Sequence, residues 1–246
     1  MAVITTRKEE SGYEVFKQKR KTTEIFERRK KLVPNGLSIF TPATISDAKG
    51  AIVTDADGNQ LIDFTGGIGV LNAGHCPPTV VKAIQEQAAK FLHTCFGVAA
   101  YELYLNVAER MIELFPHGEA TKVLLTNSGA ESVENAIKIA RQATKRPAII
   151  CYTGAFHGRT LMATSLTSKV GYRLGIGPFA PEVYRIDFPD FTRNTFGMSE
   201  DEFSDYHLRK LDDFFHYNVS EKDVAAIIIE CVQGEGGFRV TPKKYL

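Results

Sequence analysis

Short apolar runs that alternate with amphipathic helical patterns are the feature that most restricts how this chain can fold. Apolar, β-branched runs of strand length lie at residues 123–126, 148–152 and 225–230. Stretches with the helical spacing of apolar residues lie at 80–92, 101–115, 132–144 and 200–215. Strands that are apolar throughout are typical of parallel sheets covered by helices on both faces. The sequence therefore predicts an α/β fold with a mostly parallel sheet, in which ligands bind beyond the carboxyl ends of the strands.

The sequence KVLLTNSGAESVE at residues 122–134 joins the first of these runs to a helix. The unpaired N–H groups and the positive dipole end of such a helix bind anions, so a phosphate fits here. Ser128 could add a hydroxyl donor, and Gly129 would let the backbone come close. The same residues also describe an ordinary serine N-cap with Glu131 in the first helical turn, and taken alone they favour that simpler interpretation.

Two more glycine-rich stretches follow predicted strands. In the stretch 153–159, the ring of Phe156 could stack on a flat heterocycle and Arg159 could bind a carboxylate. A core phenylalanine and a surface arginine are the alternatives. In the stretch 230–237, Glu230 follows a buried strand and needs a hydrogen-bond donor or a cation, unless the loop is simply solvated. A phosphate, a flat ring and a carboxylate substrate together indicate pyridoxal 5'-phosphate as the cofactor.

A β-hairpin is predicted at 51–64, where two apolar runs flank the turn sequence DADGN at 55–59. Three glycines at 66, 67 and 69 come directly after it. They indicate either a backbone that approaches a ligand closely or a flexible loop, and this stretch alone does not separate the two.

Composition and charge exclude several classes of function. The net charge of +1 provides no field that favours nucleic acid or an acidic membrane. No apolar run is long enough to span a bilayer, and no apolar secretory segment is present, so a cytoplasmic protein is expected. Cys76 and Cys95 form no C-x-x-C pair, and Cys151 and Cys231 lie in apolar runs. The last two are predicted to be small buried residues in a reducing compartment.

From about residue 32 to 246 the chain resembles the class III (ω-amino acid) aminotransferases, which are pyridoxal-phosphate enzymes of fold type I. The resemblance rests on four sequences in the family's order: TGGIGVLNAGH, LLTNSGAESVENAIKIAR, GAFHGRT and IIIECVQGEGGF. The stretches GGIGVLN, HTCF and FHGRT look most like 4-aminobutyrate aminotransferases. Acetylornithine and ornithine aminotransferases share several of these sequences.

The resemblance implies a role for individual residues. The implied cofactor-binding residues are Ser128, Gly129, Ala130, Phe156, His157 and Glu230. The implied substrate-binding residues are Ile68, Arg159 and Glu235. Arg159 would take the far carboxylate of the ω-amino acid, and Glu235 would match the glutamate that pairs with a switching arginine. Cys231 departs from the family, in which proline usually follows the glutamate at position 230.

The resemblance also implies that residues 1–246 are an N-terminal portion. Residues 1–70 would be a helix and a hairpin belonging to the small domain, and residues 71–246 a partial cofactor-binding large domain. Thr241 and Pro242 read as the start of a helix. The family's Schiff-base lysine, its aspartate facing the pyridine nitrogen and its switching arginine all lie further along the chain. This chain is therefore expected to be inactive alone, with no catalytic lysine of its own.

The activity implied for the complete protein is transfer of an amino group from an ω-amino acid, best matched by 4-aminobutyrate, to 2-oxoglutarate. Its partners would be amino acid and 2-oxo acid substrates, and it would form a homodimer when complete. Acetylornithine or ornithine aminotransferase is one alternative, and an aminomutase, racemase or decarboxylase on the same fold is a second. A non-catalytic binding or assembly subunit that keeps the phosphate site is a third.

Overall fold

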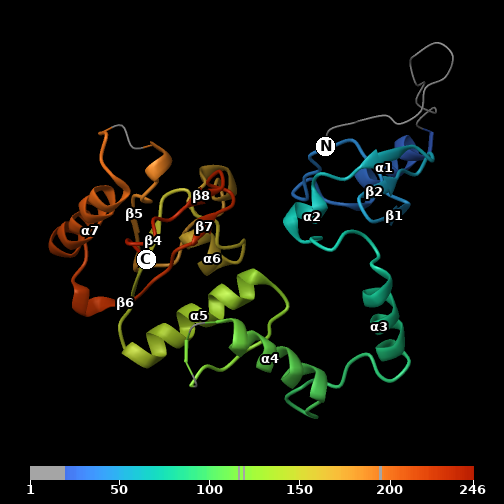
Figure 1. Cartoon of the computed structure of the whole chain (residues 1–246). Coiled ribbons are helices and arrows are strands. Elements are labelled where there is room, and N and C mark those ends of the chain that lie inside the picture. Colours follow the sequence, from blue (N-terminus) through green and yellow to red (C-terminus); the bar gives the residue numbers. More distant parts are fainter. Residues whose placement is uncertain (1–19, 116, 119, 194–195) are drawn as a thin grey trace. The chain divides into compact units, whose positions relative to one another are not determined.

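The computed structural model of the chain describes residues 20–115, 117–118, 120–193 and 196–246, and its contacts form two compact units. Unit 1 ends at Leu105 and unit 2 begins at Asn106 (Figure 1). The helix predicted in the N-terminal segment is observed as α1 (Arg20–Leu32), while residues 1–19 lie outside the described residues. The predicted division into 1–70 and 71–246 stays a prediction.

Unit 1 contains a three-stranded antiparallel sheet followed by helices. The strands β1 (Asp47–Lys49), β2 (Ile52–Thr54) and β3 (Gln60–Ile62) pair in the order of the sequence. The hairpin predicted at 51–64 is therefore confirmed. Asp55 closes its turn, because one carboxylate oxygen accepts the backbone N–H groups of both Asp57 and Asn59.

Three helical segments follow the hairpin. The short turn α2 (Gly66–Gly69) contains left-handed residues and is not a regular helix. The helices α3 (Pro78–Ala88) and α4 (Glu102–Leu114) match the predicted helices at 80–92 and 101–115, and α4 crosses the boundary between the units. Neither α3 nor α4 contains a buried residue among the described ones.

Unit 2 is built on a parallel sheet with the strand order β5-β4-β6. Its strands are β4 (Ala148–Tyr152), β5 (Val183–Ile186) and β6 (Val224–Ile227). The central strand β4 is buried along its whole length, which agrees with its apolar sequence. A mostly parallel sheet in an α/β unit is therefore confirmed.

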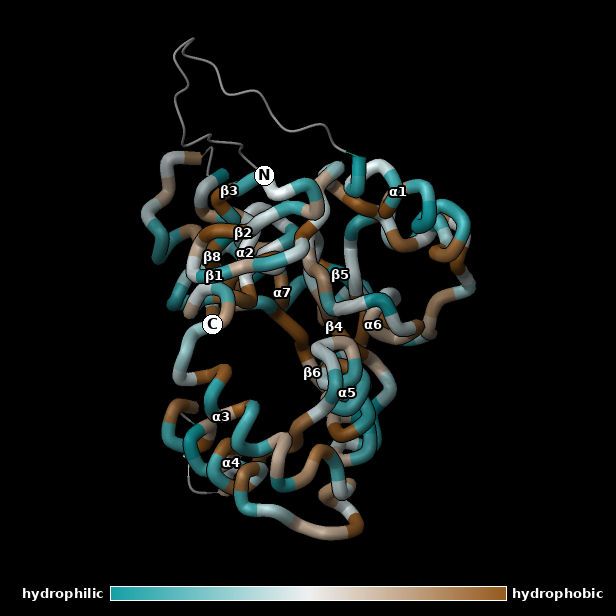
Figure 2. The backbone as a smooth tube through the Cα atoms, turned by 90° about the vertical axis from the view of Figure 1, so that its right-hand side faces the viewer, coloured by the Kyte–Doolittle hydropathy of each residue, from teal (hydrophilic) through white to brown (hydrophobic). Residues whose placement is uncertain are grey.

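Helices cover both faces of this sheet. On one face, Ile149 and Cys151 pack against Ile137 of α5 (Gly129–Thr144) and against α6 (Leu161–Leu166). On the other face, Ile150 and Tyr152 belong to a core that includes apolar side chains of α7 (Glu200–Tyr217). Figure 2 shows mixed hydrophilic and hydrophobic colouring along α5, as expected for a helix with one buried face. Packing on both faces therefore holds the carboxyl ends of the strands in position.

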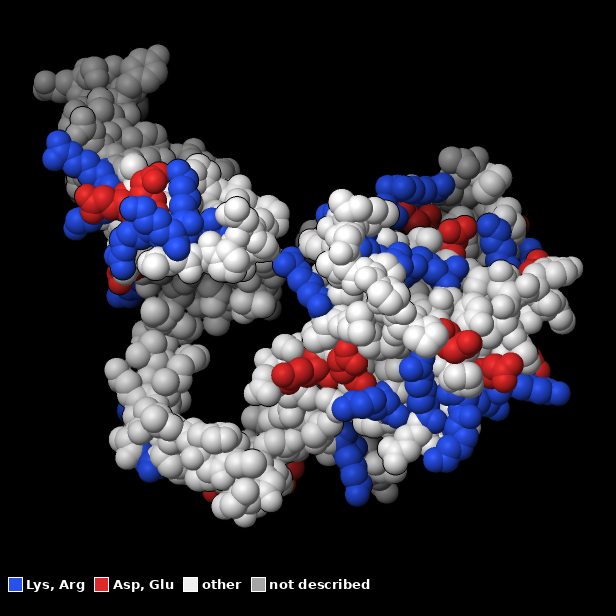
Figure 3. All heavy atoms as spheres, turned by 180° about the vertical axis from the view of Figure 1, so that it is seen from behind, with Lys and Arg blue, Asp and Glu red and all other residues white. Residues whose placement is uncertain are grey.

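The remaining elements of unit 2 are short. They are the 3-10 turns η1 (Val170–Tyr172), η2 (Phe191–Arg193) and η3 (Glu221–Asp223), and a two-stranded ribbon of β7 (Val232–Gln233) and β8 (Arg239–Val240). Lys and Arg side chains are interspersed with Asp and Glu over the visible face (Figure 3). Within the described part of the chain, no helix has the length and apolar character needed to cross a membrane.

Three sequence predictions are corrected by the structure. Residues 123–126 form no strand, and Leu124 is exposed, since no described strand pairs with this run. The strand predicted at 225–230 is shorter and ends at Ile227, although the N–H of Ile228 still donates to Ile150. Cys231 is exposed because it lies beyond that strand, whereas Cys151 is buried as predicted.

Candidate active site

The N-terminus of α5 is shaped as an anion site. Ser128 is its N-cap with extended backbone, and its Oγ accepts the N–H of Glu131 at 3.2 Å. The hydroxyl proton of Ser128 is not used in this bond and can still be donated. The N–H groups of Gly129 and Ala130 belong to the first helical turn, which has no acceptor inside the helix. The predicted N-cap is confirmed, and it coexists with donors suited to a phosphate.

A close backbone approach joins this helix end to the second predicted loop. Gly158 has a φ of +126°, and a Cβ there would lie 2.7 Å from the Cβ of Ala130. The N–H of Met162, at the start of α6, donates to Oε1 of Glu134 on α5 at 3.2 Å. The loop at 153–159 is therefore held directly against the first turns of α5.

Glu230 joins the second and third loops. Its carboxylate accepts the N–H of Phe156 at 2.9 Å and the N–H of Gly234 at 3.2 Å. The sequence-based expectation that Glu230 meets hydrogen-bond donors is confirmed. A carboxylate that bridges two loops through charge-assisted bonds fixes their relative position.

Gln233 fills the space beneath these loops. Its side chain is 0 % exposed, and its Nε2 donates to the carbonyl of Thr153 at 2.9 Å. A Cβ on Gly154 would lie 2.7 Å from Oε1 of Gln233, and a Cβ on Gly236 would collide with the same atom. A side chain at either glycine would therefore displace the buried amide, and the φ of +79° at Gly154 is itself unfavourable for other residues.

His157 is buried, and one of its polar atoms lacks a partner among the residues that the structure describes. Its side chain is 8 % exposed, and its backbone N–H donates to Oγ1 of Thr167 at 3.0 Å. Burial, and to a smaller degree the charge of Arg185, lowers the pKa of His157 to about 4. The ring is therefore neutral at pH 7, and within the described residues its Nε2 has no hydrogen-bond partner. A buried nitrogen of this kind is costly unless a further group binds it.

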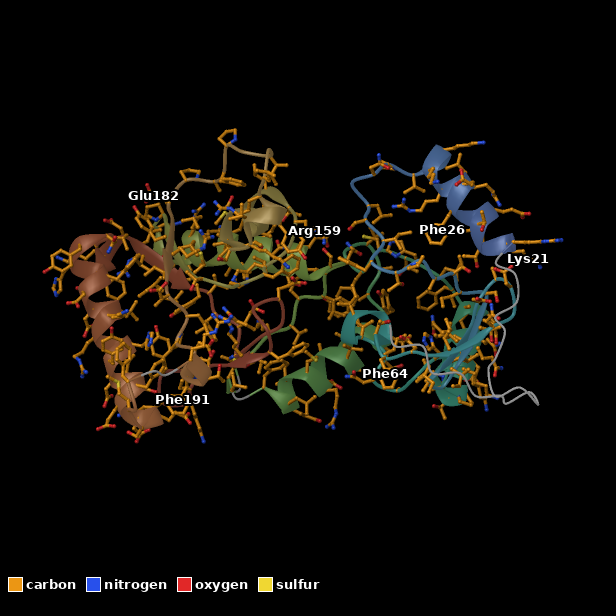
Figure 4. The ribbon with its side chains drawn as sticks, turned by 90° about the horizontal axis from the view of Figure 1, so that it is seen from above. Lys21, Phe26, Phe64, Arg159, Glu182 and Phe191 are labelled. Atoms are coloured by element: carbon orange, nitrogen blue, oxygen red, sulfur yellow. The ribbon has the colours of Figure 1, made fainter. Side chains whose placement is uncertain are left out.

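Arg159 and Glu235 meet at one aromatic side chain, Tyr172, which the sequence analysis did not single out. The Cζ of Arg159 lies 4.9 Å from the centroid of the Tyr172 ring, and the Tyr172 hydroxyl donates to Oε2 of Glu235 at 3.2 Å. Phe156 packs edge-on against the same ring, with centroids 5.2 Å apart. Figure 4 shows Arg159 beside the start of α6.

Lys169 is the second residue that the sequence analysis did not assign to the site. Its Nζ lies 3.3 Å from Oε2 of Glu235 and 5.4 Å from the centroid of the Tyr172 ring. Both residues come from the segment after α6, where no local pattern marks them. Only the folding of this segment over the strand ends brings them to the cluster.

Ile68 belongs to unit 1, so its predicted role at the site stays a prediction. The residue is 84 % exposed and its φ is 65°. The carboxylate of Asp63 supports the turn around it by accepting the N–H groups of Thr65 and Gly66, together with a bond from His75 at 2.8 Å. Hydrogen bonds from the Thr65 hydroxyl and from His75 hold the pKa of Asp63 well below its ordinary value.

Comparison with known proteins identifies the family to which the chain belongs. The sequence profile of the family "Aminotransferase class-III" matches residues 35–246. The chain belongs to the class III aminotransferases. The cofactor of this family is pyridoxal 5'-phosphate, and the resemblance proposed from the sequence is confirmed.

Curated relatives of this aminotransferase chain include three bacterial enzymes. It is 42% identical over 226 residues to a probable 4-aminobutyrate aminotransferase of Bacillus subtilis. It is 43% identical over 228 residues to a 5-aminovalerate aminotransferase of Pseudomonas putida, and 42% identical over 224 residues to the 4-aminobutyrate aminotransferase of Escherichia coli. These matches cover 91–92% of the chain and 51–52% of each relative. The chain thus spans about half the length of the curated relatives it matches.

Solved structures show the same fold. An (S)-enantioselective omega-transaminase from Thermomicrobium roseum matches with a TM-score of 0.80 and 30% identity, over 91% of this chain and 52% of that one. A taurine:2-oxoglutarate aminotransferase from Bifidobacterium kashiwanohense, in complex with PLP and glutamate, matches with a TM-score of 0.80 and 27% identity, over 91% and 51%. The predicted fold type I architecture of this class III aminotransferase chain is confirmed.

Proposed function

We propose that the protein to which this chain belongs transfers an amino group from a short ω-amino acid to 2-oxoglutarate, with pyridoxal 5'-phosphate as cofactor. The observation that carries this proposal is the packing of Gly158 against Ala130, which holds the Arg159 loop beside the anion-binding end of α5. The proposed phosphate donors and the proposed carboxylate-binding cation therefore belong to the same unit. That combination suits a phosphorylated cofactor and an acidic substrate.

The residues present fit the cofactor. The N–H groups of Gly129 and Ala130 and the hydroxyl of Ser128 would hold its phosphate, and a Cβ added at Gly129 would meet no heavy atom within 4 Å. The ring of Phe156 would stack on the pyridine. The buried Nε2 of His157, which has no partner among the described residues, would gain one from a group bound beside it. When bound, pyridoxal phosphate supplies the electron sink for the carbon that carries the amino group.

The remaining proposed residues orient the site and the substrate. The carboxylate of Glu230 accepts the backbone N–H of Phe156. It therefore fixes the position of the Phe156 ring relative to the loop at 230–237. Arg159 binds the carboxylate of the ω-amino acid, and Glu235 adjusts the site to the second substrate. Ile68 would line the substrate pocket.

The names of the relatives support an ω-amino acid as the proposed amine donor. Similarity to 4-aminobutyrate and 5-aminovalerate aminotransferases is nearly equal, at 42% and 43% identity. One methylene in an apolar pocket changes binding by only about 1–3 kcal/mol, so one site can accept both donors. Ornithine is the alternative donor, since an ornithine aminotransferase structure from Toxoplasma gondii also matches, with 28% identity and a TM-score of 0.72.

The proposal extends to parts of the protein outside this chain. We place the cofactor-bearing lysine beyond residues 1–246, and we infer that the complete protein is a homodimer in which residues 1–70 belong to a small domain. Lys169 does not replace that lysine, since it pairs with Glu235 on the surface and its side chain is 61 % exposed. Purified residues 1–246 should therefore show no transamination, and appreciable turnover would contradict this placement.

Cofactor binding is tested with Ser128→Ala and a matched control. Pyridoxamine 5'-phosphate is the probe, because its amine forms no covalent bond with lysines. Loss of the Ser128 donor should weaken its binding about tenfold, as measured by fluorescence titration of the intact protein, and leave unphosphorylated pyridoxamine unaffected. Ser199→Ala removes the corresponding N-cap of α7 and should leave both affinities unchanged. Equal effects of the two substitutions would contradict a phosphate role for Ser128.

The activity itself is tested by glutamate formation from 2-oxoglutarate. The intact protein should use 4-aminobutyrate or 5-aminovalerate in preference to ornithine. If the protein binds pyridoxamine 5'-phosphate but produces no glutamate from any ω-amino acid, the non-catalytic binding subunit is the correct alternative. Products other than glutamate would instead indicate a mutase, racemase or decarboxylase.

A further inference from the structure

Glu235 lies in the short loop that connects the two strands of the β7–β8 ribbon. The register of the ribbon pairs Gln233 directly with Arg239, so these two residues form the base of the loop at 234–238. The loop has the sequence GEGGF. Because glycine backbone is conformationally permissive, the position of such a loop is set by what holds its two ends.

The first end of the loop is held by buried polar contacts. The side chain of Gln233 is fully buried and donates to the carbonyl of Thr153 at 2.9 Å. The N–H of Gly234 donates to the carboxylate of Glu230 at 3.2 Å. Since Thr153 directly follows β4, this end of the loop is tied to the central strand of the sheet.

The second end of the loop is held by an ion pair. Nε of Arg239 lies 3.1 Å from Oδ2 of Asp190, and the two side chains are 22 % and 8 % exposed. Asp190 lies in the segment after β5, and its N–H donates to the carbonyl of Phe188 at 2.8 Å. The hydroxyl of Thr192 donates to its other carboxylate oxygen at 2.5 Å. Within the described residues no hydrogen-bond donor is aligned with Oδ2, so the opposite charges themselves hold Arg239 in place.

Burial distinguishes this pair from the other ion pairs around it. Arg193 approaches the same oxygen of Asp190 at 3.3 Å, but its side chain is 70 % exposed. Lys169, which pairs with the carboxylate of Glu235, is 61 % exposed. Exposed charges are screened by water and salt, whereas the loss of one partner from a shielded pair leaves the other charge uncompensated. The position of the loop therefore depends more on Arg239 than on these exposed cations.

We propose that Asp190 and Arg239 are positioning residues that fix the loop at 234–238 and thereby place Glu235 for the exchange between the ω-amino acid and 2-oxoglutarate. The proposal rests on the proposed function of Glu235, which adjusts the site to the second substrate. Neither positioning residue touches substrate or cofactor in this role. Their loss therefore changes the balance between the two substrates and does not abolish the activity.

The test compares Arg239→Met with the unaltered protein during glutamate formation by the intact protein. The measured quantity is the kcat/KM for 4-aminobutyrate divided by the kcat/KM for 2-oxoglutarate. Displacement of Glu235 should change this ratio about three- to tenfold, because the lost contact acts through the loop and not on the substrate directly. Arg239→Lys keeps the charge and should restore the ratio. An unchanged ratio in Arg239→Met, or an equally altered ratio in Arg239→Lys, overturns the proposal.

A double variant shows whether the effect passes through Glu235. Glu235→Gln should change the ratio by itself, and the addition of Arg239→Met to Glu235→Gln should then change it no further. Additive effects of the two substitutions overturn the proposal, because Arg239 would then act by a route that does not include Glu235.

Arg193→Met is the matched control. It removes an ion pair with the same oxygen of Asp190, but Arg193 is not part of the ribbon. The ratio should equal that of the unaltered protein, and a change as large as that of Arg239→Met overturns the role of the ribbon. Asp190→Asn covers the case in which Arg239→Met does not fold. An unchanged ratio in Asp190→Asn then overturns the proposal.

Hydrogen exchange measures the position of the loop without any use of the activity. The N–H of Gly237 donates to the carbonyl of Gly234 at 3.1 Å inside the loop, and the N–H of Thr241 donates to the carbonyl of Cys231 at 2.9 Å at the far end of the ribbon. In Arg239→Met, exchange should become about tenfold faster at Gly237 and stay unchanged at Thr241. Unaltered exchange at Gly237, or equal acceleration at both amides, overturns the proposal.

This measurement also separates the proposal from the proposed function. If Glu235→Gln leaves the substrate ratio unchanged, the proposed function of Glu235 fails. Exchange at Gly237 still decides whether Asp190 and Arg239 hold the loop.

Discussion

Gly158 and Ala130 are packed so closely that only a glycine fits at position 158. A Cβ there would lie 2.7 Å from the Cβ of Ala130 and 3.0 Å from its Cα, and the φ of +126° is unfavourable for any other residue. This contact decides how the loop carrying Phe156 and Arg159 meets the end of α5.

The first prediction concerns Gly158→Ala. Overlap with Ala130 and backbone strain should lower the free energy of unfolding of unit 2 by about 1–3 kcal/mol, and weaken pyridoxamine 5'-phosphate binding as the loop withdraws. Urea unfolding and fluorescence titration measure the two effects. Gly171→Ala is the control, since a Cβ there meets nothing within 4 Å. Equal unfolding midpoints for both variants would contradict the prediction.

The second prediction concerns Glu230→Gln. An amide oxygen can accept only one of the N–H groups of Phe156 and Gly234, and the amide NH₂ then faces the other. Unfolding free energy should fall by about 1–3 kcal/mol, and hydrogen exchange at the two backbone amides should become faster. Glu221→Gln, at an exposed glutamate, should leave both quantities unchanged. Unaltered exchange at Phe156 would show that the carboxylate does not hold this loop.

The third prediction concerns pH and His157. Its pKa is lowered from 6.5 to about 4, so the unfolded chain binds a proton that the folded protein does not bind between these values. Neutral His157 therefore contributes to the free energy of unfolding. This contribution, on the order of 3 kcal/mol, is fully present above pH 6.5 and is lost as the pH falls towards 4.

The comparison that isolates His157 is the difference between the unaltered protein and His157→Gln. The pKa of His207 is also lowered, chiefly by burial, but His207 is present in both proteins and cancels. The exposed His216 provides the control substitution, His216→Gln. Direct NMR titration of the His157 ring covers the case in which His157→Gln does not fold. A titration midpoint near 6.5 would contradict the prediction.

The fourth prediction concerns the turn that carries Ile68. Asp63→Asn removes a carboxylate that accepts bonds from Thr65, Gly66 and His75. Hydrogen exchange at the amides of Thr65 and Gly66 should become about tenfold faster, because one charged acceptor is replaced by a single amide oxygen. The exposed Asp47 is the control, and Asp47→Asn should leave exchange in this turn as it is. If these two amides exchange as slowly in Asp63→Asn as in the unaltered protein, the turn is held by its backbone alone.

Local signals in the sequence predicted the elements whose stability is local. Ser199 and Glu202 have the S-x-x-E spacing that is typical of a capping box and form a complete one at the start of α7, and Ser128 caps α5. The strand β4 could be predicted from its apolar sequence, because a strand that is buried along its whole length needs no polar residues. In each case the residues that define the element lie within it or directly next to it.

Elements that depend on distant partners could not be predicted in the same way. The strand β5 is only four residues long and contains Arg185, whose guanidinium donates to carbonyl groups at the end of α6. The run at 123–126 has the composition of a strand, but composition does not supply a neighbouring strand. The contacts of Tyr172 with Arg159 and Glu235 join residues 13 and 63 positions apart, so no local pattern reveals them.

The buried amide of Gln233 constrains the order in which substitutions can accumulate in this lineage. A side chain at Gly236 is blocked for as long as Gln233 occupies this space, and one at Gly154 is disfavoured in addition by its φ of +79°. Gln233 cannot shrink first without leaving the carbonyl of Thr153 without its donor. The three positions are therefore epistatic, and a mutational path through any one of them passes through a less stable protein. Libraries that vary Gly236 and Gln233 jointly should therefore recover variants that libraries varying them singly lose, whereas Gly154 stays restricted by its backbone in both.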